Sequence, residues 1–133
     1  VRQLNELKSL GIKVAMDDFG TGFSSLSYLR TFPFDTIKID KAFVQAMQTS
    51  KESRAIVSAV AGLGRDLGIR TIAEGIETNA QLDFVREQGC MDAQGYLFSP
   101  PMPAATIDDL ITLMQQAPAR GAKKRSSLKP VHI

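Results

Sequence analysis

The segments "LKSLGIKVAMDD", residues 7–18, and "LGRDLGIRTIAEG", residues 63–75, share the pattern that decides the fold class. In each, the end of an expected helix is followed by a glycine, an apolar strand and an acidic residue six positions after the glycine, at Asp17 and at Glu74. Helix and strand alternating at this spacing predict parallel βαβ units with right-handed crossovers. We therefore expect functional side chains at the carboxyl ends of the strands.

Two further segments extend the pattern. "FPFDTIKID", residues 32–40, supplies a short strand that carries Lys38, and "VREQGCMDAQG", residues 85–95, repeats the order of glycine and strand and reaches Gln94. Apolar periodicity predicts helices between the strands. The expected helices cover residues 24–30, 52–67, 78–88 and 105–116, with Asn79 and Thr106 as candidate N-caps.

Four such units predict an α/β fold that is half of a closed barrel. A (β/α)8 barrel of the TIM type takes about 250 residues, whereas this chain has 133. The alternative is an open flavodoxin-like sheet, which would fit this length. That fold is expected to carry a glycine-rich phosphate loop after its first strand, and "DDFGTG", residues 17–22, is acidic at that place.

The composition is that of one modest globular domain, with 44% hydrophobic and 23% charged residues. The net charge of +2 arises from residues 117–133, which hold basic residues and no acid, whereas the rest of the chain has 11 basic and 14 acidic residues. We expect residues 1–116 to fold and residues 117–133 to form a disordered basic tail. No aromatic residues alternate with its basic residues, so we expect no specific nucleic-acid partner.

Other features indicate the compartment. Cys90 is the one cysteine of the sequence, so no internal disulfide can form, which fits a reducing cytoplasm. No apolar run approaches the roughly 20 residues of a membrane span, and no signal-peptide pattern is present. We expect a cytoplasmic segment without membrane contact, although upstream domains of a longer protein could anchor it. "VRQLNELKSLG", residues 1–11, begins inside a helix, which indicates that the chain continues upstream.

The polar residues at the expected strand ends indicate metal and phosphate chemistry. Asp17, Asp18 and Glu74 would form an oxygen-rich site for a hard cation such as Mg²⁺ or Mn²⁺. The alternative for each acid is a helix cap or a solvated turn. Lys38 lies between Ile37 and Ile39, so strand alternation directs it to the opposite face. Its candidate roles are stabilisation of a phosphate or Schiff-base formation, and the alternative is a lysine that reaches solvent.

Four motifs in order resemble the second half of EAL-domain cyclic di-GMP phosphodiesterases. They are "DDFGTGFSSLSYL" (17–29), "FDTIKIDKAFV" (34–44), "TIAEGIET" (71–78) and "QGYLFSPP" (94–101). The resemblance covers about residues 1–116. It implies the C-terminal half of a (β/α)8 barrel that binds two divalent metal ions, Mg²⁺ or Mn²⁺, and hydrolyses cyclic di-GMP to linear pGpG.

The resemblance also implies roles for single residues. Asp17 and Asp18 resemble metal ligands, and Glu74 resembles a catalytic carboxylate that holds a metal ion or its water. Lys38 resembles the catalytic lysine beside the nucleophilic water. Gln94 resembles a polar substrate-site residue. Glu77 resembles a glutamate that contacts the metal ligands rather than the metal ions themselves. The equal alternative is that its charge stabilises the N-terminus of a helix.

Departures from the family pattern leave alternatives open. The sequence contains no Glu-Ala-Leu motif, which we expect upstream together with further ligands. "SPP", residues 99–101, stands where the family often has a basic residue before the proline. A non-catalytic cyclic di-GMP receptor is therefore the second interpretation, and a Schiff-base aldolase that uses Lys38 is the third. We expect this chain alone to be inactive as a monomer and to self-associate, because half a barrel exposes its inner face and two strand edges.

Overall fold

Four short strands form one parallel sheet in the sequential order β1-β2-β3-β4. The computed structural model describes residues 2–20, 29 and 31–116, and the sheet lies within the first of two units, residues 1–100 and 101–133. The strands are β1 (Ala15–Phe19), β2 (Thr36–Ile39), β3 (Arg70–Ala73) and β4 (Asp92–Ala93). The predicted parallel α/β arrangement is confirmed.

The register of the sheet is regular on one side of β2 and irregular on the other. β2 and β3 pair without interruption from Thr36 opposite Arg70 to Ile39 opposite Ala73. Between β1 and β2 the register shifts after Met16, so that Asp17 and Asp18 together oppose Lys38. This is the two-against-one geometry of a β-bulge.

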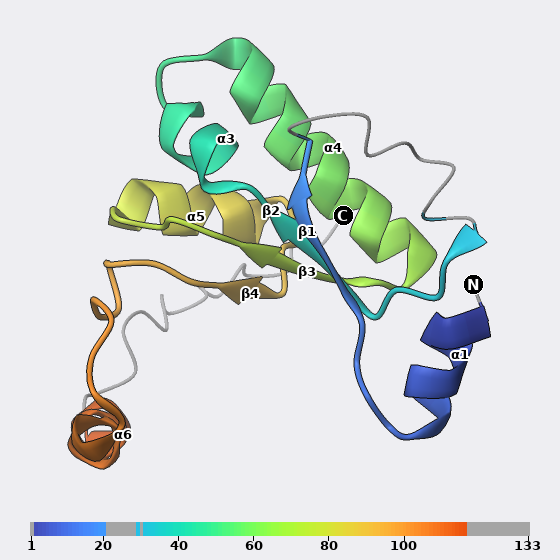
Figure 1. Ribbon diagram of the computed structural model, residues 1–133. Helices are drawn as coiled ribbons and strands as arrows, with labels where there is room; N and C mark the ends of the chain where they lie inside the picture. Colours follow the sequence, from blue (N-terminus) through green and yellow to red (C-terminus); the bar gives the residue numbers. More distant parts are fainter. Residues whose placement is uncertain (1, 21–28, 30, 117–133) are drawn as a thin grey trace, which may run out of the picture. The chain divides into compact units, whose positions relative to one another are not determined.

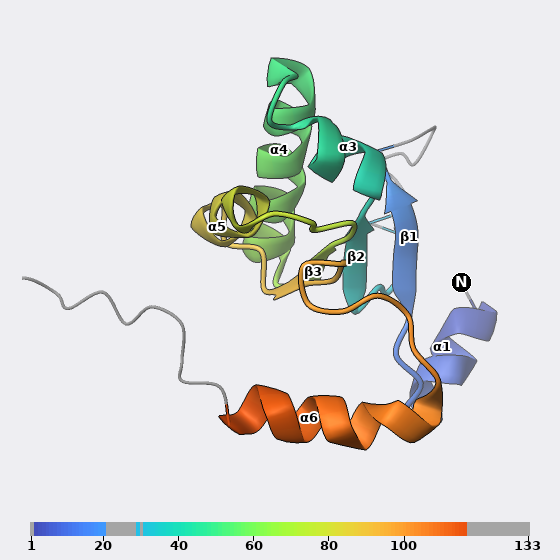
Figure 2. The same cartoon turned by 90° about the vertical axis from the view of Figure 1, so that its left-hand side faces the viewer.

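Helices cover one face of the sheet (Figures 1 and 2). The helix α4 packs against β2, β3 and α5, and α3 packs against α4. Among the side chains between the sheet and these helices, Ile37, Ile39, Val44 and Val57 are completely buried. The helices of the first unit are α1 (Arg2–Ser9), α3 (Lys41–Ala46), α4 (Lys51–Leu67) and α5 (Asn79–Glu87).

The ends of these helices differ in detail from the sequence prediction. Helix α3 was not predicted, because six residues are too few for a periodic apolar pattern; it begins after Asp40, whose carboxylate accepts a hydrogen bond from the Ala42 amide at 2.7 Å. Helix α5 begins after Thr78, which forms a capping box with Gln81, so the prediction of Asn79 as the N-cap was wrong. A cap takes extended backbone angles, and Thr78 has them at φ −127° and ψ 153°.

The second unit contains η1 (Ala104–Thr106) and α6 (Ile107–Gln116), which together match the helix predicted over residues 105–116. Thr106 is the last residue of η1, and its hydroxyl donates to the Pro103 carbonyl oxygen at 2.8 Å. Nearly all of the helix predicted over residues 24–30 and the whole tail 117–133 lie outside the described residues. None of the described helices is both long and apolar enough to cross a membrane.

Candidate active site

Three carboxylates meet at the carboxyl end of the sheet. Asp17 and Asp18 lie near the end of β1, and Glu74 directly follows β3. One oxygen from each of the three lies within 4.8 Å of the others. The structure thus brings together the three residues that the sequence singled out as metal ligands, and it offers only oxygen donors, which Mg²⁺ and Mn²⁺ prefer.

The bulge in β1 explains how two consecutive residues reach one site. Consecutive side chains of a regular strand point to opposite faces of the sheet. Here Asp18 takes a left-handed backbone conformation with φ 51°, alone among the non-glycine residues that the structure describes. The inserted residue turns the strand, so both carboxylates stay on the exposed side while Phe19 returns to the buried layer.

Lys38 lies between two of these carboxylates. Its ammonium Nζ is 2.9 Å from Asp17 Oδ1 and 2.5 Å from Glu74 Oε1. Its neighbours Ile37 and Ile39 are completely buried on the opposite face of the sheet, as strand alternation predicted. Hydrogen bonds to Glu74 and to Asp17 raise the pKa of Lys38. The amine is therefore held in its protonated form, which disfavours the Schiff-base interpretation, because that chemistry requires a neutral amine.

The two adjacent aspartates have opposite electrostatic environments. The hydrogen bond from Lys38 lowers the pKa of Asp17. The charge of Asp17 raises the pKa of Asp18, and burial and the carboxylates of Asp40 and Glu74 act in the same direction. One ammonium therefore does not balance the negative charge of the cluster. A divalent cation would relieve this repulsion, which is the physical reason why the cluster fits a metal ion.

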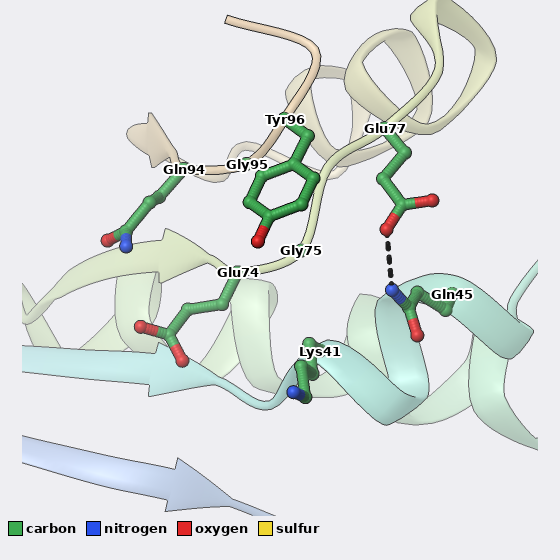
Figure 3. A pocket seen from close by; sticks show the side chains of 8 residues that line it. All are labelled: Lys41, Gln45, Glu74, Gly75, Glu77, Gln94, Gly95 and Tyr96. Carbon is green, nitrogen blue, oxygen red and sulfur yellow. Dashed lines mark hydrogen bonds between the residues drawn. The ribbon is translucent and has the colours of Figure 1, made fainter. Parts of the chain in front are cut away.

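Glu74 also lines a pocket of about 370 Å³. Side chains from the ends of β3 and β4 and from α3 form its walls (Figure 3). The lining residues are Lys41, Gln45, Glu74, Gly75, Glu77, Gln94, Gly95 and Tyr96. Gln94, predicted as a substrate-site residue, and Glu77, predicted as a supporting residue, therefore both line this pocket, whereas neither belongs to the carboxylate cluster.

Two glycines allow the chain segments around this pocket to approach closely. A Cβ atom on Gly95 would lie 2.1 Å from the Ile76 carbonyl oxygen, and one on Gly75, at φ 72°, would lie 2.6 Å from the Lys41 Cβ. The loops after β3 and β4 are joined by a hydrogen bond from the Ile76 amide to the Gln94 carbonyl oxygen at 3.0 Å. Side chains at these glycines would push the loops apart and change the pocket.

Sequence reasoning missed three residues of this pocket, Lys41, Gln45 and Tyr96. The signal that could have located the first two is Asp40, a strong N-cap residue that directly follows a strand. A helix beginning at Lys41 would place Lys41 and Gln45 four positions apart on one face. No comparable signal in the sequence indicates Tyr96.

Comparisons with known proteins agree with the fold and identify the family. The EAL domain family model matches residues 2–101. The cyclic di-GMP phosphodiesterase RocR of Pseudomonas aeruginosa is 48% identical over 103 residues, which are 77% of this chain and 26% of RocR. The chain spans 13 to 26% of the length of the curated relatives it matches.

Solved structures show the same similarity. The PaMucR phosphodiesterase in complex with cyclic di-GMP matches with a TM-score of 0.75 and 43% identity, over 78% of this chain and 42% of that chain. BlrP1 of Klebsiella pneumoniae, in a complex with manganese and cyclic di-GMP, matches with a TM-score of 0.69 and 41% identity, over 75% and 26%. The chain therefore belongs to the EAL domain family, and its βα units are the C-terminal part of that family's TIM-type barrel.

Proposed function

We propose that this chain supplies the C-terminal part of the active site of a metal-dependent phosphodiesterase that hydrolyses cyclic di-GMP to linear pGpG. The observation that carries the proposal is the cluster of Asp17, Asp18 and Glu74, with ligand atoms within 4.8 Å, next to the ammonium of Lys38. The PaMucR and BlrP1 complexes with cyclic di-GMP, at 43% and 41% identity, support the choice of substrate.

Asp17, Asp18 and Glu74 are the residues that would hold two Mg²⁺ or Mn²⁺ ions, together with ligands from the rest of the barrel. Bound there, divalent cations supply Lewis-acid chemistry, which activates water and offsets the charge of a phosphodiester. The donor set fits hard cations, and the raised pKa of Asp18, caused first by the charge of Asp17, indicates the excess of negative charge that they would neutralise. The manganese in the BlrP1 complex is consistent with this choice.

Lys38 and Gln94 act directly on the substrate in this proposal. Lys38 holds a fixed positive charge beside the reacting phosphate, where it stabilises the negative charge that develops in the transition state. Its ion pairs with Asp17 and Glu74 fix the ammonium before the substrate arrives. Gln94 offers a polar group to the substrate from the adjoining pocket, and Glu77 lies in the same pocket as a supporting residue.

The test uses the complete protein, in which this chain is joined to the rest of its barrel. Cyclic di-GMP is incubated with Mg²⁺ or Mn²⁺ and the products are separated by chromatography. We expect pGpG, and no product when a chelator is in excess. Hydrolysis that persists in the chelator would refute the metal-dependent mechanism. Binding of cyclic di-GMP without hydrolysis in any metal would instead identify a non-catalytic receptor.

We further propose that the isolated chain self-associates and is inactive. One face of the sheet is covered by helices, whereas Arg70 on the other face is exposed, and β1 and β4 are the edge strands of the described sheet. Such edges and faces favour association with another chain. Analytical ultracentrifugation should detect dimers or larger species. A compact monomer that hydrolyses cyclic di-GMP would contradict this proposal.

A further inference from the structure

We propose that Gln45 is a positioning residue that acts through Glu77: it holds the Glu77 carboxylate against α3 and so keeps the pocket open to an anionic substrate. This inference rests on the function proposed above. The Nε2 atom of Gln45 donates to Oε1 of Glu77 at 2.9 Å (Figure 3). Both side chains are exposed to solvent and line the same pocket as Glu74.

The backbone of the loop that carries Glu77 is fixed without Gln45. The side-chain oxygen of Gln81, a residue that is only 5% exposed, accepts hydrogen bonds from the Glu77 amide at 2.8 Å and the Thr78 amide at 3.0 Å. On the other side of the loop, Gly75 packs directly against Lys41. The backbone conformation is therefore independent of Gln45, and the contact with Gln45 determines only the direction of the Glu77 side chain.

The direction of this side chain decides the charge inside the pocket. A glutamate on an exposed loop has several rotamers, and some of them would bring a second carboxylate into the space beside Glu74. A phosphodiester that enters there would be repelled by the additional negative charge. The neutral amide of Gln45 holds Glu77 at the wall without adding a charge of its own. We expect this restraint to act on substrate binding more than on the chemical step.

Gln48 provides a matched comparison in the turn that follows α3. Its Nε2 atom donates to the Thr78 hydroxyl at 3.1 Å, so it contacts the residue next to Glu77 from a position three residues after Gln45. Unlike Gln45, Gln48 does not line the pocket beside Glu74. Loss of Gln48 removes one hydrogen bond to the loop but leaves Glu77 in place. The two glutamines therefore separate a positioning role from a general structural role.

The experiment compares Gln45→Leu and Gln48→Leu in the complete protein with cyclic di-GMP as substrate. We expect Gln45→Leu to raise KM and the calorimetric Kd by roughly 3- to 10-fold, the effect of one hydrogen bond, with kcat changed less than about twofold. Gln48→Leu should leave KM within about twofold of the parent. Equal effects of the two variants on KM would overturn the proposal.

Two further measurements test whether Gln45 acts through Glu77. In a Glu77→Ala background, Gln45→Leu should change the Kd for cyclic di-GMP by less than about twofold, because no carboxylate remains to be held. An unchanged effect in that background would overturn the proposal. Hydrogen exchange of the Glu77 and Thr78 amides should be the same in the parent and in Gln45→Leu. Faster exchange in the variant would show that Gln45 supports the fold of the loop instead.

A contact measurement keeps this inference separate from the proposed function. The side-chain amide resonances of Gln45 should shift when Glu77 is replaced by alanine, whatever the substrate of the protein is. A protein that does not bind cyclic di-GMP but shows this shift would refute the proposed function and retain the contact. Resonances that do not shift would show that the contact is absent in solution, which would overturn the inference itself.

Discussion

The two neighbours of β2 pair with it in different ways, and the difference explains the chemistry of the site. On one side, β3 follows β2 residue by residue, so Lys38 lies opposite Ile72 and Ile39 opposite Ala73. On the other side, β1 contributes two residues, Asp17 and Asp18, opposite the single Lys38. The regular pair builds the buried layer, whereas the bulged pair gathers charge at the exposed edge.

This comparison shows how one sheet serves both stability and function. A regular strand offers one functional side chain for every two residues on a face. The bulge places two adjacent carboxylates at one edge, at the cost of a left-handed conformation at Asp18 and of repulsion that raises the pKa of Asp18. Strain and like-charge repulsion of this kind are expected at functional sites. The regular β3 side supplies Glu74 at a backbone position without a left-handed conformation.

Replacing Asp17 by asparagine should cause the largest effect on activity. The amide keeps the shape of the side chain but loses the negative charge of one metal ligand, so we expect hydrolysis of cyclic di-GMP to fall by roughly 100-fold or more. Asp17 is 63% exposed, so the melting temperature should change little. The control for loss of charge is Asp66→Asn, because Asp66 is an acid on α4 that is 73% exposed. Near-parental turnover of Asp17→Asn would remove Asp17 from the metal site.

Replacing Lys38 by methionine tests the residue that the bulged and regular sides share. The uncharged side chain should lower single-turnover rates by roughly 10- to 100-fold, while the affinity for cyclic di-GMP largely survives, because the charge acts mainly in the transition state. The pKa of Asp17 should rise, since Lys38 lowers it. Carboxyl NMR titration and rapid quench would measure the two effects. Lys13→Met, at a lysine 82% exposed beside Asp35, is the control. Lost affinity with an unchanged rate would make Lys38 a binding residue.

Replacing Gly64 tests the packing of α4 against β3, the strand on the regular side of β2. A Cβ atom there would lie 2.2 Å from the Thr71 Cγ2 and 2.9 Å from the Ile69 carbonyl oxygen. We expect Gly64→Ala to lower the free energy of unfolding by about 1–2 kcal/mol, because overpacking outweighs the gain in helix propensity. In Gly62→Ala on the same helix, the new Cβ meets only an Arg65 side-chain nitrogen, at 3.6 Å, so a gain of up to about 1 kcal/mol is expected. Urea unfolding measures both, and equal effects would contradict the packing argument.

The regular side of the sheet is the part that could be predicted from the sequence. The spacing from Gly68 to Glu74 located β3 and the acid at its end, and the apolar neighbours of Lys38 gave the direction of its side chain. These are local patterns, in which residue type and period carry the information. The placement of Asp17, Asp18 and Glu74 in one cluster followed from parallel strands that share a carboxyl edge.

The bulge and the contacts across α3 could not be predicted in this way. Strict alternation would place Asp17 and Asp18 on opposite faces, and only the pairing of β1 with β2 shows that it is broken. The bond between Gln45 and Glu77 joins residues 32 positions apart, and no local pattern encodes it. Asp35 shows the same limit: it accepts a hydrogen bond from the Val14 amide at 2.9 Å and pairs with Lys8 at 3.0 Å, contacts that depend on tertiary structure.

The smallest expected effect is a difference between the two aspartates of the bulge in how protein stability depends on pH, measured in excess chelator. The pKa of Asp18 is raised in the folded state, so the unfolded state releases this proton at lower pH, and the contribution of Asp18 to stability falls as pH rises through the two pKa values. The pKa of Asp17 is lowered, so its contribution rises with pH over the corresponding interval. Relative to the parent, Asp18→Asn should therefore gain stability as the pH rises above the ordinary carboxyl pKa of 3.8, whereas Asp17→Asn should lose stability as the pH rises towards 3.8 from below. Urea unfolding at several pH values measures both. Because the two side chains are exposed and solvent screens their charges, the differences in stability should be small. Added Mg²⁺ should make Asp18→Asn less stable than the parent, since the variant loses a metal ligand that the parent keeps. The same sign for both variants in chelator would show that the bulge does not hold the two carboxylates in different environments.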